Sequence, residues 1–173
     1  MANPTMTLIG TPITVGSGGA SSVTFSSIPA TYTDLVLRLS ARGSTTSVAG
    51  NLYLTFNAQA QGSITTLLGD GTTATSNRFS YSGFQYTRLD NPNANATAST
   101  FSNVEFYFPY YQSTASKPFS LSSAVEQNAT LGYISAQAGL HAGTSGITSI
   151  DIAPDSGSFV QYSSFYLYGI SNA

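Results

Sequence analysis

The sequence lacks cysteine and carries very little charge. Five Lys and Arg and seven Asp and Glu make 7% of its 173 residues charged, against about 25% in a typical soluble domain. Without cysteine, zinc fingers, redox motifs and disulfide frameworks are excluded. The net charge of −2 and the scarcity of basic residues also exclude electrostatic capture of nucleic acid, which needs clustered Lys and Arg. We therefore expect no nucleic-acid partner.

Long apolar runs are absent as well. No window approaches the run of about 18 apolar residues that a membrane helix requires, and Met1–Gly10 has neither the basic nor the apolar region of a signal peptide. We expect no membrane partner and no secretion by that route.

Neutral polar residues and an adequate apolar fraction take the place of charge. The chain has 27 Ser and 22 Thr, and 41% of its residues are hydrophobic, enough to bury the core of one domain. Water would solvate such a surface through hydrogen bonds to neutral hydroxyl and amide groups. Contacts made through it would depend little on salt, because few charges are present to be screened.

Apolar residues alternate with period two in segment after segment, which predicts half-buried β-strands. The clearest strand is Thr33–Arg42, where Leu residues and Ala41 point one way and Asp34, Arg38 and Arg42 point the other. About ten such segments, with turns between them, predict an all-β domain, an antiparallel two-sheet β-sandwich of jelly-roll type. Its predicted core includes Phe25, Leu35, Leu37, Leu39, Leu52, Leu54, Phe106, Leu121 and Ile152.

Residues 1–22 are predicted to form an N-terminal arm and the sandwich to occupy 23–173. Residues 16–22, rich in Gly and Ser, have the composition of a flexible linker. The segment before them could add a strand to a neighbouring subunit or to a capsid shell, or could be the first strand of the sandwich. Its docking residues would be Met6, Leu8, Ile9, Ile13 and Val15.

Catalytic and metal-binding patterns are sparse, and we predict no catalytic residue, cofactor or metal. His141 is the only histidine and is interpreted as a turn or strand-end residue, because no nucleophile motif accompanies it. Asp151 and Asp155 give the only hint of a calcium loop. Glycoside hydrolysis needs two carboxylates, and the candidates are Asp34, Asp70, Asp90, Glu105, Glu126, Asp151 and Asp155.

The segment Asp90–Thr100 is predicted to be a long exposed loop that makes few core contacts. Elsewhere, two strands are apolar on both faces. In Phe159–Ile170 and in Val104–Tyr111, aromatic residues, Tyr111 among them, occupy the face opposite the expected core side. A strand with one face in water should show only one apolar face, so we predict a subunit interface in preference to internal cover by a loop. Its residues would be Tyr107, Tyr162, Tyr166 and Tyr168.

Two segments carry a family resemblance. Val23–Arg42 (VTFSSIPATYTDLVLRLSAR) and Phe159–Ile170 (FVQYSSFYLYGI) resemble virion structural proteins of tailed bacteriophages, notably those of cyanobacteria and marine bacteria. Together they bracket about 150 residues.

The resemblance implies a non-enzymatic protein of the capsid or tail surface, made in the host cytoplasm. The small size and the lack of a fibre shaft, a coiled-coil heptad or a collagen-like repeat favour a capsid decoration (cement) protein. It is expected to bind the major capsid protein as a homo-oligomer, a trimer. The alternative is a tail or head fibre that binds a receptor carbohydrate.

Overall fold

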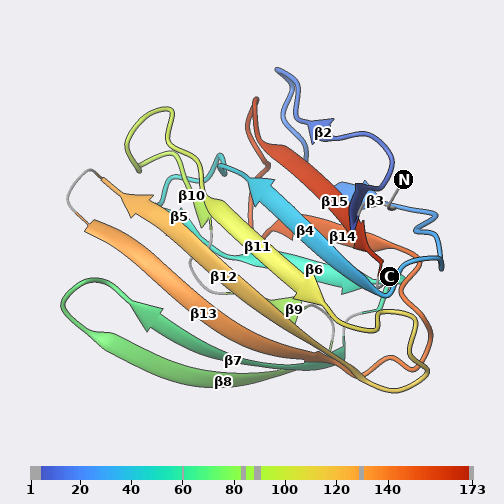
Figure 1. Cartoon of the computed structure of the whole chain (residues 1–173). Coiled ribbons are helices and arrows are strands. Elements are labelled where there is room, and N and C mark those ends of the chain that lie inside the picture. Colours follow the sequence, from blue (N-terminus) through green and yellow to red (C-terminus); the bar gives the residue numbers. More distant parts are fainter. Residues whose placement is uncertain (1–4, 60, 83–84, 88–90, 129–130, 172–173) are drawn as a thin grey trace.

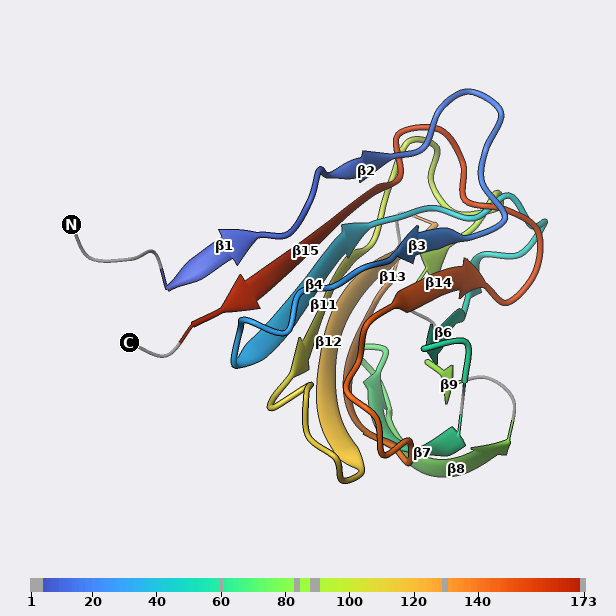
Figure 2. The ribbon, with the colours of Figure 1, turned by 90° about the vertical axis from the view of Figure 1, so that its right-hand side faces the viewer.

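The computed structural model describes residues 5–59, 61–82, 85–87, 91–128 and 131–171, and over these residues the fold is all-β, with antiparallel sheets and no helix. The predicted all-β class is therefore confirmed. Figure 1 shows one large twisted sheet, and Figure 2 shows a smaller sheet lying over one of its faces. No helix in the described part of the chain is long and apolar enough to cross a membrane.

The large sheet has nine strands. In spatial order they are β1 (Met6–Leu8), β15 (Ser164–Ile170), β4 (Asp34–Ser40), β11 (Asn103–Phe108), β12 (Lys117–Gln127), β13 (Leu131–His141), β7 (Gln61–Gly69) and β8 (Ala74–Ser82), with β2 (Ile13–Thr14) also paired to β15. The four-stranded sheet has the order β3 (Val23–Phe25), β14 (Ile150–Pro154), β6 (Leu52–Phe56) and β9 (Gln85–Tyr86). A third, two-stranded sheet pairs β5 (Ala49–Gly50) with β10 (Asn91–Pro92).

The core lies between the large and the four-stranded sheets, and all nine predicted core residues are buried in it. Phe56 of the smaller sheet packs edge-on against Phe108 of the large sheet, with ring centroids 5.5 Å apart. The ring centroid of Phe119 lies 5.9 Å from that of Phe56. A β-carbon at Gly139 would come within 2.0 Å of the Phe119 ring, so this strand needs glycine where the aromatic ring crosses it.

The N-terminal segment pairs with the last strand of its own chain. Met6 and Leu8 lie opposite Ile170 and Tyr168, and the N–H of Val15 donates to Ser163 O at 2.8 Å. The Gly/Ser-rich stretch that follows forms a turn and then an isolated bridge between Ala20 and Phe159. The segment thus completes one edge of the large sheet, as Figure 2 shows.

The final apolar run is not one strand, contrary to the predicted Phe159–Ile170 segment. β15 begins only at Ser164, because the chain turns before it: the N–H of Ser163 donates to Val160 O at 3.2 Å, and Tyr162 adopts a left-handed backbone with φ of 72°. Neither Gly nor Pro marks this turn, so the alternating pattern runs straight through it.

The predicted exposed loop is packed in part, which corrects the interpretation of residues 91–100: Ala94, Asn95, Ala98 and Ser99 are exposed, and the other residues are buried or half-buried. Asp90 lies outside the described residues. Asn91, Asn93 and Ala96 are buried. Residues 91 and 92 pair with β5, and Arg42 holds the rest of the loop, because its buried guanidinium donates to the carbonyl oxygens of residues 94, 96, 97 and 100 at 2.7 to 3.3 Å. The loop therefore wraps around one cation that precedes it by more than fifty residues.

Three side chains expected on the outer side of strands are buried instead. Arg42 serves the loop just described, and Asp34 is 6% exposed. Tyr111 follows the end of β11 and points into the core, where it is 0% exposed and its hydroxyl donates to Pro29 O. The predicted position of Tyr111 on the second face was wrong, because β11 ends at Phe108 and the alternation ends with it.

Candidate functional site

The candidate site is the outward face of the large sheet, the side away from the four-stranded sheet. Strand pairing places Leu8, Tyr168, Val36 and Tyr107 directly opposite one another on β1, β15, β4 and β11. Directly opposed side chains on neighbouring strands lie in contact range. They form a continuous apolar and aromatic row, called here the tyrosine row. Leu8 and Tyr107 are 37% and 38% exposed.

A buried carboxylate fixes one end of the tyrosine row. Asp34 Oδ2 accepts a hydrogen bond of 2.7 Å from the Tyr107 hydroxyl, and Oδ1 accepts one of 2.9 Å from the backbone N–H of Tyr110. The hydrogen bond to Asp34 and partial burial raise the pKa of the Tyr107 phenol above its usual value, so the phenol remains a donor at neutral pH. Its ring is thereby held in one orientation on the surface.

Beside the tyrosine row lies a polar row. Tyr166, Arg38, Glu105, Ser122 and Ala136 are opposed on β15, β4, β11, β12 and β13. Arg38 Nε donates to Glu105 Oε2 at 2.6 Å. Because their side chains are 56% and 42% exposed, this ion pair contributes little stability, about 0 to 1 kcal/mol. Its charges remain available to a ligand or partner.

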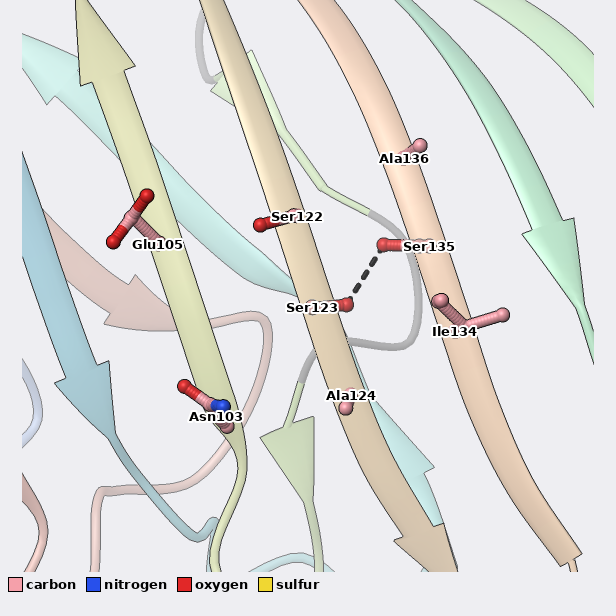
Figure 3. A pocket seen from close by; sticks show the side chains of 8 residues that line it. All are labelled: Asn103, Glu105, Ser122, Ser123, Ala124, Ile134, Ser135 and Ala136. Atoms are coloured by element: carbon pink, nitrogen blue, oxygen red, sulfur yellow. Dashed lines mark hydrogen bonds between the residues drawn. The ribbon is translucent and has the colours of Figure 1, made fainter.

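A shallow hollow of about 370 Å³ opens next to this ion pair. Figure 3 shows Asn103 and Glu105 on one side and Ile134 on the other, with small side chains of β12 and β13 between them. The hollow forms because the side chains of Ser122, Ala124 and Ala136 are small and do not fill the surface between the larger residues. Below it, the hydroxyl groups of Ser123 and Ser135 lie 2.7 Å apart and link the two strands.

The structure brings together three of the four predicted interface residues. Tyr107, Tyr166 and Tyr168 share the outward face, and Tyr162 lies apart from them on the turn before β15, 68% exposed. Sequence reasoning missed Val36, which joins the tyrosines across β4. Its place within an apolar run concealed that it faces outward.

The five predicted docking residues divide along the N-terminal segment. Met6 and Leu8 are exposed on the edge strand β1, and Ile9 and Ile13 are partly buried against the core. Val15 is 5% exposed and belongs to the core. Only the first two are therefore available to another molecule in this arrangement.

The candidate catalytic carboxylates are dispersed. Among the described residues that line the hollow, Glu105 is the single carboxylate, whereas glycoside hydrolysis needs two flanking the sugar. Hydrogen bonds from Thr72 and Thr73 hold the pKa of the Asp70 carboxyl well below its usual range, at the tip of the β7–β8 hairpin. Each of the other described candidate carboxylates accepts hydrogen bonds from its own donors: Tyr107 and Tyr110 for Asp34, Arg38 for Glu105, Thr97 and Thr100 for Glu126, Thr24 for Asp151, and Asn51 for Asp155.

No cluster of three or more His, Cys, Asp or Glu side chains suited to a metal ion occurs within the described ranges. The two residues of the calcium hint, Asp151 and Asp155, bind separate partners. His141 ends β13 and is 2% exposed.

Comparison with known proteins leaves the outward face as the main guide to function. No family model matches the chain, and no curated protein matches it.

Proposed function

We propose that the chain is a non-enzymatic structural protein of a phage virion, a capsid decoration protein that binds the head and self-associates as a trimer through the tyrosine row. The observation that carries the proposal is the second apolar face of the large sheet, formed by Leu8, Tyr168, Val36 and Tyr107. Tyrosine favours interfaces because its ring contributes apolar area while its hydroxyl remains paired.

The finer fold assignment belongs to this proposal. We propose a jelly-roll type of β-sandwich, supported by a chain that passes repeatedly between the two sheets: β3 lies in the smaller, β4 in the larger, β6 in the smaller and β7 in the larger. The edge segment β1–β2 is proposed as the arm that reaches the capsid shell, with Met6 exposed on it beside the tyrosine row.

A surface with so few charges suits a permanent assembly. The described part of the chain holds one salt bridge, Arg38–Glu105, so screening by salt would affect few contacts. The proposed partners are other copies of the chain and the major capsid protein, with neither nucleic acid nor membrane involved.

The second candidate is a tail or head fibre that binds a carbohydrate receptor. The hollow favours it specifically, because Glu105, Asn103 and Ser122 offer the carboxylate, amide and hydroxyl groups that bind sugar hydroxyls. Quantitative mass spectrometry of purified particles separates the two roles. Copies in proportion to the capsid subunits fit decoration, a small fixed number fits a fibre, and absence from the particle contradicts both.

Tyr168→Asp is expected to dissociate the assembly. Tyr168 lies between Leu8 and Val36, so a carboxylate there has no cation opposite it and would be costly to bury. Tyr166 is a poorer choice because Arg38 lies opposite it. Sedimentation velocity at micromolar concentration should show oligomer for the parent and monomer for the variant.

The matched control is Asn95→Asp, which adds the same charge on the exposed part of the 91–100 loop. It should leave the oligomer intact. A parent protein that sediments as a monomer, or a Tyr168→Asp protein that stays assembled, would count against the tyrosine row as the interface.

A further inference from the structure

Two basic side chains are buried beside each other at one end of the large sheet. Lys117 begins β12 and His141 ends β13, and strand pairing places them directly opposite. They are 1% and 2% exposed. Basic groups are seldom buried without an acidic partner, because removing a charge from water is costly.

Lys117 ties two loops together. Its ammonium donates to Ala115 O at 3.0 Å, in the loop after β11, and to Gly143 O at 2.8 Å, in the loop after β13. The same loops meet again where the N–H of Ile147 donates to Tyr111 O at 2.9 Å. Both of these acceptors are neutral carbonyl groups, and no carboxylate in the described part of the chain forms a salt bridge with Lys117.

His141 is enclosed by groups that favour its neutral form. The Phe56 ring of β6 lies 4.9 Å from the imidazole, and His141 Nδ1 has no hydrogen-bond partner among the residues that the structure describes. Burial, and then the charge of Lys117 on β12, lower the pKa of His141, while a hydrogen bond with the Gln61 backbone of β7 acts in the opposite direction. Within the described ranges, Lys117 is the one charged group acting on the imidazole; Asp34, which anchors the same loop, is engaged by Tyr107 and Tyr110.

We propose that Lys117 and His141 form an acid-sensitive latch. At neutral pH the imidazole is uncharged and the two loops, 109–116 and 142–149, are held together by Lys117. A proton on His141 places a second buried cation beside the ammonium, and the loops separate to let water reach it. The fold thus carries a switch that opens one end of the molecule under mildly acidic conditions.

The direction of the pH dependence follows from linkage. The pKa of His141 in the folded protein lies below its usual value of 6.5, so the unfolded or opened state binds the proton more tightly. The stabilisation is complete above pH 6.5 and is lost as the pH falls from 6.5 toward the folded-state pKa. The loss begins near pH 6.5, above the usual carboxyl pKa values of about 4, so its onset precedes acid unfolding by Asp and Glu.

The test uses the full chain, in which one histidine gives one unambiguous imidazole signal. NMR titration should give a pKa below 6.5 for His141, and Lys117→Met should raise it toward 6.5. A wild-type pKa at or above 6.5, or a pKa unmoved by Lys117→Met, would overturn the latch.

Amide hydrogen exchange, corrected for the intrinsic effect of pH, reads the opening directly. Between about pH 7.5 and 5.5 we expect several-fold faster exchange in residues 109–116 and 142–149 and no change at the β7–β8 hairpin tip, which lacks a group that titrates in this window. His141→Gln should abolish the pH difference in both loops. An equal pH difference in that variant would contradict the proposal.

Discussion

Truncating Leu37 to alanine is expected to lower the free energy of unfolding by roughly 2 to 5 kcal/mol. Leu37 is 0% exposed and lies between Phe106 on β11 and Leu167 on β15, both fully buried. Its removal would leave a cavity that rigid neighbouring strands cannot fill. Urea denaturation followed by circular dichroism measures the loss.

The chain offers a matched control for this change. Leu67 has the same side chain on the outward face of β7 and is 54% exposed, so Leu67→Ala should change stability by only about 0.5 kcal/mol. Equal losses for the two variants would mean that Leu37 is not in the core.

Replacing Arg42 by methionine is expected to cost roughly 2 to 4 kcal/mol, because a buried carbonyl left without a donor costs about 1 to 3 kcal/mol. Methionine keeps most of the aliphatic length and removes the guanidinium that binds the carbonyl groups of Ala96, Thr97 and Thr100. Residues 93–100 should lose order together, visible as faster amide exchange in that loop alone.

Arg38 provides the comparison, since it lies on β4 only four residues earlier and its side chain is 56% exposed. Arg38→Met removes only the surface ion pair with Glu105 and should cost less than about 1 kcal/mol. If Arg42→Met were as mild as Arg38→Met, the loop would be held by something other than the guanidinium.

Alternation predicted the parts of this fold that depend on local pattern. Leu35, Leu37 and Leu39 recur at every second residue, and a strand with one face in the core needs that spacing. The β7–β8 hairpin was also predictable, because Gly69-Asp70-Gly71 marks its turn and Asp70 binds the backbone there. In these places the local sequence alone decides the conformation.

The predictions were wrong where residues distant in the sequence determine the local conformation. Nothing within 91–100 indicates that part of the loop is packed. Arg42, which the alternation of Thr33–Arg42 had placed outward, holds residues 94–100. Tyr162 follows the same alternation as Tyr166, yet a turn separates it from β15.

The candidate site was predicted in outline. Two apolar faces on one strand indicated the tyrosines, while the contribution of Val36, the Asp34 anchor and the hollow beside Glu105 depend on which strands become neighbours. The order β15-β4-β11 joins segments more than fifty residues apart. Local spacing carries no information about that order.

The most direct test of the proposed function is an electron cryomicroscopy map of the phage particle to which that proposal assigns the chain. The proposed function predicts density for this all-β domain on the outside of the head, in threefold groups, with the tyrosine rows facing one another and β1 directed to the shell. A map in which the head bears no such density, or in which the domain is present with its tyrosine row open to solvent, would contradict it.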